Sequence, residues 1–177
     1  MESRHGLPLK KRPRDLFFVF AFSFFAFSSF CSDALHGLDL VDADSFWGRA
    51  NLWYGEIADD QFFLQDNEFA RLNTAISGLI YGPFYLVLVF SFVRGANWVR
   101  TPALIYVGAM LHGYLEFMWW EYAIGPPPGN PAVFWAFNAP YFFVPLLLGV
   151  RMWKPTPFGQ LESGMPRAQT DVAPAVG

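Results

Sequence analysis

Four stretches of this chain are apolar enough to lie in lipid, and this feature constrains its fold more than any other. With the first extended through Asp33 and Leu35, they give predicted spans over residues 16–35, 72–93, 102–123 and 132–152. A membrane-spanning helix needs about 20 mostly apolar residues, and each span has about that length. The sequence therefore predicts an all-α membrane protein, a four-transmembrane-helix bundle.

The composition excludes an ordinary soluble domain. Of the 177 residues 54% are hydrophobic and 20% aromatic, while only 15% are charged, against about 25% in a typical soluble domain. We find no metal-ligand cluster, phosphate-binding loop or nucleophile motif, so neither metal nor cofactor is expected. The few basic residues lie beside a predicted span, which argues against a nucleic-acid partner.

The charges are distributed unevenly along the chain. Residues 1–15 carry five Lys or Arg, whereas residues 34–71 carry eight acidic residues against two Arg. Lys and Arg favour the cytosolic side, so we expect both termini in the cytosol and the first loop in the lumen. The predicted organisation is a basic N-terminus over residues 1–11, a membrane domain over 12–153 and a disordered tail over 154–177.

The first apolar stretch and the loop that follows it each have a distinctive composition. The first apolar stretch could be a cleaved secretory signal, but it is long for one and leads into Asp33, so we expect it to be retained. The loop between the first two spans is rich in aromatic residues, which suit the membrane interface. We expect this lumenal loop to form short helices over the mouth of the bundle.

Polar residues inside the spans are costly in lipid and therefore informative. His112 and Glu116 are four residues apart and share a helical face; such a pair can move protons near neutral pH, or can simply pack against a neighbouring helix. Glu121 lies nearer the lumenal end, where an interfacial position suits it better. Asn138 and Tyr141 also share a face, in a span where Pro140 and Pro145 favour a kink.

Two segments contain residues that oppose a regular helix. Gly82-Pro83 favours a break in the second span, and the segment from Gly125 to Pro131 favours a stiff turn between the third and fourth. Cys31 has no second cysteine with which to form a disulfide.

Several of these residues occur in motifs of a known family. The chain resembles the EXPERA superfamily, which includes emopamil-binding protein (the Δ8–Δ7 sterol isomerase) and the sigma-two receptor, over about residues 12–153. The receptor-like motifs are Arg12-Pro13-Arg14-Asp15, Trp53-Tyr54 with Asp60, the segment from Trp98 to Tyr106, and Ala139-Pro140-Tyr141. The isomerase-like motifs are Asp66-Asn67, Gly82-Pro83-Phe84 and Asn138-Ala139-Pro140-Tyr141.

The resemblance implies a four-helix bundle in the endoplasmic reticulum membrane with a sterol-sized cavity that opens laterally to lipid. In the isomerase pattern, the acid of the first span matches Asp33, the Asn of the last span matches Asn138, and its Trp is Tyr141 here. The isomerase His falls on Ser29, and the acid of the second span falls near Asn73 or Thr74, where no carboxylate is present.

Two functions follow as expectations. A binding protein would hold a sterol or related lipid without turnover, through Asp33, Asp60, Glu116, Trp120, Asn138 and Tyr141. An isomerase would shift a sterol ring double bond through Asp33, His112, Glu116 and Asn138, the His112–Glu116 pair replacing the missing groups. A partner-binding scaffold is a weaker third alternative, and a homodimer is an open alternative to a monomer.

Overall fold

The computed structural model describes residues 6–40, 42, 44–65 and 67–159. These residues form helices and no strand. Of the tail predicted over 154–177, residues 160–177 lie outside the described residues, as does the Asp66 of one family motif.

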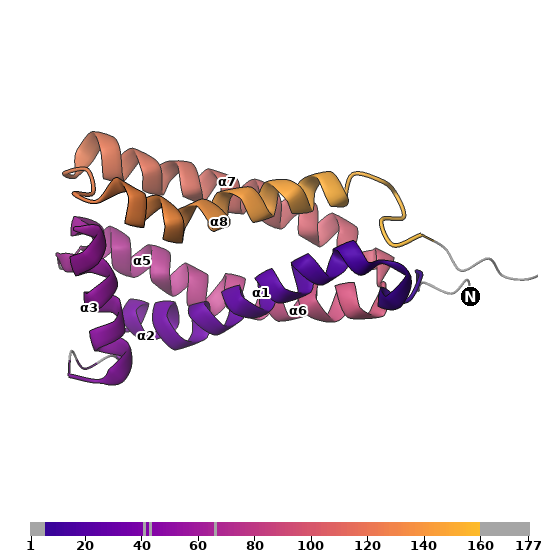
Figure 1. Cartoon of the computed structure of the whole chain (residues 1–177), viewed down its shortest axis with the longest axis horizontal. Helices are drawn as coiled ribbons and strands as arrows, with labels where there is room; N and C mark the ends of the chain where they lie inside the picture. The colour runs from indigo at the N-terminus through magenta and orange to yellow at the C-terminus, as the bar shows by residue number, and fades with distance from the viewer. Residues whose placement is uncertain (1–5, 41, 43, 66, 160–177) are drawn as a thin grey trace, which may run out of the picture.

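Four long helical rods make up the described chain (Figure 1). Three of them contain a π-helical turn of five residues, in which the helix is wider than an α-helix. The rods are α1 (Leu16–Ser28), η3 (Ser29–Asp33) and α2 (Ala34–Gly37); α5 (Glu68–Ile76), η4 (Ser77–Tyr81) and α6 (Gly82–Arg94); α7 (Arg100–Trp119) and η6 (Trp120–Ile124); and α8 (Pro131–Arg151).

Shorter helices join the rods. The expected helices of the first loop are α3 (Phe46–Ala58) and α4 (Gln61–Leu64). Three 3₁₀ turns lie at the opposite end of the molecule: η1 (Leu9–Lys11), η2 (Pro13–Asp15) and η5 (Asn97–Val99).

Three of the helices are long and apolar enough to cross a membrane. They run over Pro13–Gly37, Glu68–Arg94 and Pro131–Arg151. The rod formed by α7 and η6 is of similar length but is not among them, and it carries Arg100, His112, Glu116 and Glu121. Composition and length therefore establish a helical membrane protein with three candidate spans in its described residues.

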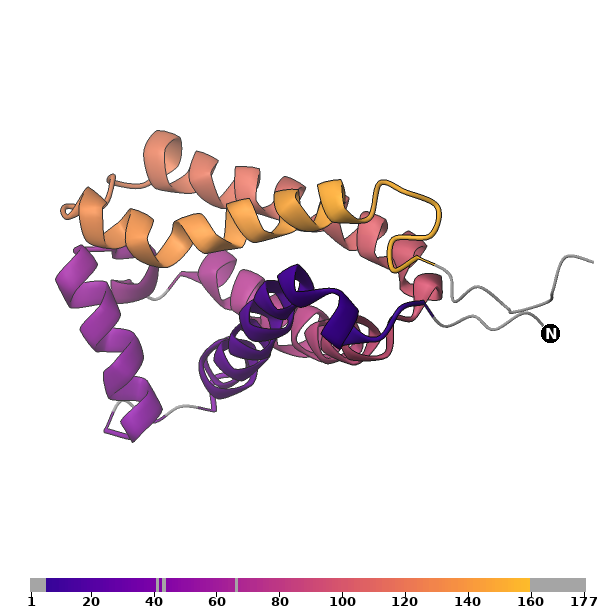
Figure 2. The ribbon, with the colours of Figure 1, turned by 45° about the vertical axis from the view of Figure 1, so that its right-hand side comes forward.

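The rods associate as two pairs. The α1–α2 rod packs along the α5–α6 rod, and α7 packs along α8. The two pairs converge at the end where the described chain begins and ends, and they separate toward the other end (Figure 1). There α3 stands across the opening and contacts both α8 and η3 (Figure 2).

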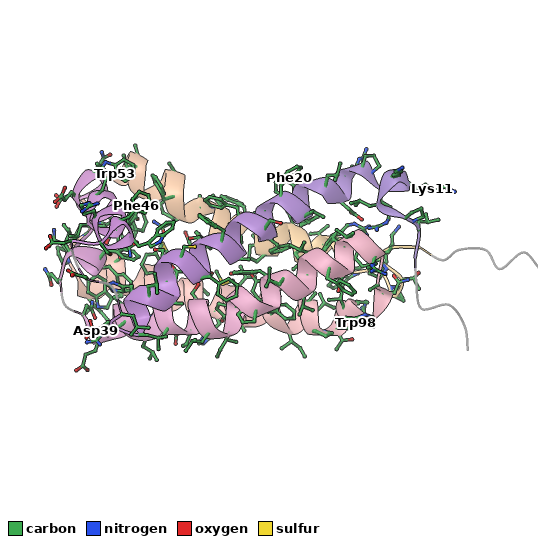
Figure 3. The ribbon with its side chains drawn as sticks, turned by 90° about the horizontal axis from the view of Figure 1, so that it is seen from below. Lys11, Phe20, Asp39, Phe46, Trp53 and Trp98 are labelled. Carbon is green, nitrogen blue, oxygen red and sulfur yellow. The ribbon has the colours of Figure 1, made fainter. Side chains whose placement is uncertain are left out.

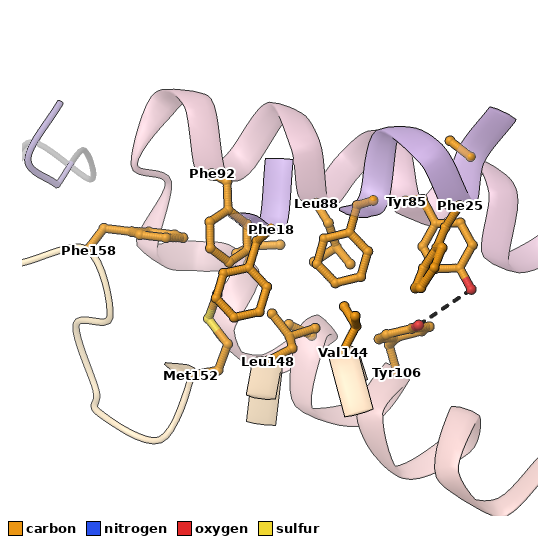
Figure 4. Close-up of a cluster of buried hydrophobic side chains, with 14 residues drawn as sticks. Phe18, Phe25, Tyr85, Leu88, Phe92, Tyr106, Val144, Leu148, Met152 and Phe158 are labelled. Atoms are coloured by element: carbon orange, nitrogen blue, oxygen red, sulfur yellow. Dashed lines mark hydrogen bonds between the residues drawn. The ribbon is translucent and has the colours of Figure 1, made fainter. Parts of the chain in front are cut away.

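The converging end has a tightly packed aromatic core. Phe22 is fully buried and stacks on Tyr85 with ring centroids 5.8 Å apart, and Phe18 stacks on Phe92 at 5.0 Å. Leu88, Val144, Leu148 and Met152 fill the space between the helix pairs (Figure 4). Each aromatic pair adds about 0.5–1.5 kcal/mol to the hydrophobic gain from burial, so this end fixes the relative positions of the rods.

Polar contacts close the same end. Arg12 and Arg151 both form ion pairs with Asp15, which is 2% exposed. The backbone N–H of Leu7 donates to the carbonyl of Phe158 at 2.9 Å, and Gly6 donates to Gly95 at 2.7 Å. The first and last described residues therefore lie side by side.

Glycines allow the first two rods to approach closely. A Cβ on Gly37 would lie 2.2 Å from the backbone nitrogen of Ala75, and one on Gly78 would lie 2.4 Å from Cα of Ala34. The expected break at Gly82-Pro83 does not interrupt the rod, which is helical from Glu68 to Arg94 and widens into a π turn just before Gly82. Similarly, α8 continues through both of its internal prolines.

Apolar side chains cover the outer surface of the rods (Figure 3). Phe20 is 73% exposed on the first rod, and Val150 is 75% exposed on α8. Large exposed apolar surface of this kind marks a membrane or protein interface. Its distribution along all four rods fits contact with lipid.

Candidate functional site

A cavity of about 640 Å³ lies between the two helix pairs, at the end where they separate. Its walls come from every rod and from the α3–α4 segment. Aromatic side chains supply much of the surface, including Phe24, Trp53, Phe63, Phe117 and Phe137. A few polar groups interrupt this apolar lining, which is the usual character of a small-molecule site.

Asp33 is the acidic group on the wall formed by the first two rods. It ends the π turn η3, and its Oδ2 accepts a hydrogen bond of 2.6 Å from the hydroxyl of Ser77 in η4. Ser77 is also 3.0 Å from the hydroxyl of Ser29. Within the described residues no ion pair includes Asp33, so its carboxyl group is available to a ligand that carries a donor.

The opposite wall carries the amide and phenol groups of α8. Asn138 donates from Nδ2 to the hydroxyl of Tyr54 at 2.7 Å and to the carbonyl of Phe134 at 2.9 Å. Tyr141 donates to the hydroxyl of Ser28 at 3.2 Å and stacks on Phe25 with centroids 4.4 Å apart. Both side chains are therefore oriented by contacts to other elements.

Asp60 lies behind this wall rather than on it. It caps α4, since its Oδ1 accepts from the backbone N–H of Phe62 at 3.0 Å, and its Oδ2 accepts from Tyr54 at 3.0 Å. The residue is fully buried, and burial raises the pKa of Asp60 above its ordinary value. Burial, with the charge of Asp60, also raises the pKa of Tyr54. Asp60 is therefore connected to the cavity indirectly, by its hydrogen bond with the lining residue Tyr54.

His112 and Glu116 lie at the rim of the cavity. His112 Nδ1 is 3.7 Å from Glu116 Oε2, and the two side chains are 75% and 55% exposed. Both also border a shallow depression on the outer face with Trp119 and Trp120. Trp120 itself is absent from the main cavity wall and packs on Phe62 with ring centroids 5.1 Å apart.

The structure therefore brings five of the predicted residues to one cavity. These are Asp33, His112, Glu116, Asn138 and Tyr141. Asp60 joins them indirectly through Tyr54, and Trp120 supports the wall from behind.

Several polar cavity residues were not among the predicted site residues, and Tyr54, Ser77 and Tyr114 are three of them. Tyr54 bridges Asp60 and Asn138, and Ser77 orients Asp33. Tyr114 places on α7 a buried hydroxyl for which the described residues provide no hydrogen-bond partner. Tyr54 has a signal in the sequence, because it belongs to a family motif with Asp60, whereas Ser77 and Tyr114 have none that separates them from other residues in apolar helices.

Comparison with known proteins adds one finding. The family model described as EXPERA (EXPanded EBP superfamily) matches residues 46–152, while no curated protein and no solved structure matches the chain. The matched range covers more than half of the chain and includes every cavity residue outside the first rod. This apolar helical chain belongs to the EXPERA family.

Proposed function

We propose that this protein binds a sterol or sterol-like amphiphile in the cavity between its two helix pairs, and serves in sterol or lipid homeostasis. The observation that carries this proposal is the cavity itself, an aromatic-lined space with Asp33 on its wall. Its volume lies within the range of about 300–1,000 Å³ that is usual for small-molecule sites. Membership of the EXPERA family supports a location in the endoplasmic reticulum membrane.

The chemistry of the walls suits an amphiphile. Aromatic and aliphatic side chains can cover an apolar ring system, and each apolar Å² removed from water contributes about 25 cal/mol. Asp33 can accept a hydrogen bond from a hydroxyl group, or pair with an ammonium group in a medium of low dielectric. The affinity would come mainly from the apolar body, and the orientation from Asp33.

We also propose that α7 crosses the membrane, which gives the four-span bundle with both termini in the cytosol. The two ends of the described chain lie at one end of the bundle, as an even number of crossings requires. The α7–η6 rod covers about 37 Å at 1.5 Å per residue. The α3–α4 segment would then lie on the lumenal side. A glycosylation acceptor inserted between Gly125 and Asn130 should be modified, and one inserted beside Gly95 should not.

Labelling with a photoreactive sterol tests the binding proposal. The probe should label peptides that line the cavity, and an excess of unmodified sterol should compete. Asp33→Asn should weaken cationic amphiphiles about 10–100-fold, because a buried charge-assisted contact is worth about 1.5–3 kcal/mol, and should weaken neutral sterols far less. Glu56→Gln, which removes an exposed acid of α3, provides the matched control. Labelling confined to the outer surface would rule out the cavity as the site.

Isomerisation of a sterol ring double bond is the second candidate function. It is favoured by the position of His112, Glu116, Asp33 and Asn138 around one cavity. One acid would protonate the alkene, and a base would remove a proton from the neighbouring carbon. Expression in cells that lack their own isomerase, followed by sterol mass spectrometry, tests this function. Absence of Δ8-to-Δ7 conversion would exclude it, and His112→Ala should abolish any conversion found.

The outward face of α7 supports a homodimer as a further part of the proposal. His112 is about 18 Å along the helix from Arg100, so the exposed His112–Glu116 pair would face the bilayer interior if α7 spans it. Such polar groups normally face a partner. A second copy would offer the same pair across a two-fold axis. Cross-linking through Leu115→Cys, in a Cys31→Ser background, should then trap a dimer.

A further inference from the structure

Two buried carboxyl groups meet where the α3–α4 segment touches α7. The segment of residues 46–64, here called the lid, covers the wide end of the bundle (Figure 2). It carries Asp60, and η6 at the end of α7 carries Glu121. Both residues are fully buried, and their side chains are within hydrogen-bonding reach of each other.

Within the part of the chain that the structure describes, Asp60 is the one polar partner of the Glu121 carboxyl group. Neither of its carboxyl oxygens receives a hydrogen bond from a donor among the described residues. Asp60, in contrast, already accepts from the Tyr54 hydroxyl and from the Phe62 amide. Two ionised carboxylates are both acceptors and repel each other, whereas one added proton creates a hydrogen bond between them.

Among the described residues, no cation forms an ion pair with either carboxyl group. On the lid, Glu56 and Asp59 are exposed acids. The basic groups of the lid and of the neighbouring rods have partners elsewhere: Arg49 of α3 donates to the carbonyl of Asp44, Arg71 pairs with Asp39 at 3.3 Å, and His112 lies beside Glu116. His36 of α2 lies against the ring of Phe63 on the other side of the lid.

We propose that Asp60 and Glu121 form a proton-binding latch, in which one shared proton holds the lid against the α7–α8 pair. With the proton present, the two side chains join by a hydrogen bond. Loss of the proton leaves two buried negative charges in contact, which favours release of the lid. The latch lies next to Tyr54 and Asn138 on the cavity wall, so its state controls access to the wide end of the cavity.

The remaining lid contacts determine what release would expose. The N–H groups of Gly129 and Asn130, just before α8, donate to the lid carbonyls of Asp59 at 3.0 Å and Ala58 at 2.9 Å. Phe62 inserts between the rods and packs on Phe117 at 4.9 Å. When the lid leaves, these two amides lose their acceptors and become open to exchange.

Hydrogen exchange of Gly129 and Asn130 therefore reports on the latch, and it needs no cavity ligand. Residues 126–128 and 131 are prolines without an amide hydrogen, so a peptide over 125–131 reports mainly these two amides. We would measure it in lipid nanodiscs between pH 4 and 8, correcting for the intrinsic rate. The equilibrium constant for lid opening should not change below about pH 4. Above that pH it should rise by up to tenfold per pH unit, and it should level off once both carboxyl groups are ionised.

Two variants and a control identify the groups responsible. Glu121→Gln and Asp60→Asn each replace an acid by a neutral amide that can still hydrogen-bond, so both should make this pH dependence clearly shallower. Glu56→Gln, an exposed acid of the same lid, should behave like the wild type. A pH-independent wild type, or a Glu121→Gln protein that keeps the full slope, would overturn the proposal.

A separate measurement on the wild type needs no variant to fold. It also distinguishes a shared proton from a bound metal cation. Infrared spectroscopy of the wild type should show a protonated carboxylic acid that persists near neutral pH and titrates over the range in which the lid opens. If no such band is present, or if protection at fixed pH instead depends on sodium or calcium concentration, the pair holds no proton and the latch is refuted.

Discussion

The hydroxyl of Ser77 donates a 2.6 Å hydrogen bond to Asp33, from one π-helical turn to another on the adjacent rod. Ser29 lies in the same turn as Asp33 and is 3.0 Å from the Ser77 hydroxyl. π-helical turns are rare and frequently occur at functional sites. The position of Asp33 on the cavity wall therefore depends on the contact between two rods, and not on its own helix alone.

Ser77→Ala should lower the free energy of unfolding by about 1 kcal/mol, the net value of one such hydrogen bond, with a further loss if Asp33 is left without a donor. Thermal unfolding in detergent measures this change. Ser23→Ala is the matched control, because Ser23 is an exposed serine of α1. Equal effects of the two substitutions would show that the Ser77–Asp33 contact contributes nothing to stability.

Close approach of the first two rods gives a second prediction. Gly78→Ala should destabilise the protein by about 1–3 kcal/mol, because its Cβ would overlap the backbone of Ala34 and force the rods apart. Gly108→Ala is the control on α7, where a Cβ meets nothing within 4 Å. Alanine is the better helix former, so this control should be neutral or slightly stabilising. Comparable melting temperatures for both variants would contradict the close packing.

The ion-pair cluster at the converging end gives a third prediction. Asp15→Ala should cost about 3–5 kcal/mol, because it leaves two arginines without their shared carboxylate. Arg12 is 8% exposed and would keep a buried, unpaired charge. Asp44→Ala, at an exposed acid near the start of α3, should change stability by less than about 0.5 kcal/mol. The two variants are compared by thermal unfolding, and a similar small loss for both would contradict a structural role for Asp15.

Much of the helical organisation could be predicted from the sequence, because apolar run length and turn residues are local signals. The predicted span over 132–152 is observed as a helix over Pro131–Arg151, and that over 102–123 as a rod over Arg100–Ile124. The Pro-rich segment before Pro131 is non-helical, as expected. The predicted break at Gly82-Pro83 was wrong, because the helix continues through this proline after a π turn.

The arrangement of the site was harder to predict from the sequence, because it depends on contacts between distant segments. Helical spacing placed His112 and Glu116 on one face correctly, but spacing cannot tell whether that face points inward, and the pair lies at the exposed rim. Glu121 appeared interfacial from its neighbours Trp119 and Trp120, yet it is fully buried against Asp60, 61 residues earlier in the chain. No local pattern reports such a pairing.

Tyr54→Phe provides a prediction with a definite pH dependence. The substitution removes the donor to Asp60 Oδ2 and the acceptor for Asn138. Leaving a buried carboxylate oxygen unsatisfied should cost about 1–3 kcal/mol at neutral pH. The Tyr54 hydrogen bond lowers the pKa of Asp60, against the larger effect of burial, so its loss should raise that pKa further.

The sign of the pH effect follows from linkage. Asp60 has a pKa raised above that of the unfolded chain, so its contribution is fully present below about pH 4 and is lost as the pH rises through the folded-state value. In Tyr54→Phe that loss continues to higher pH, because the folded-state pKa is higher still. The variant should therefore lie closest to the wild type near pH 4, and the difference should grow toward pH 7.5. Unfolding in detergent at pH 4, 6 and 7.5 measures this trend, with the exposed Tyr122→Phe as the control. A deficit of the same size at all three values would mean that the lost hydroxyl acts through packing, without the carboxyl group of Asp60.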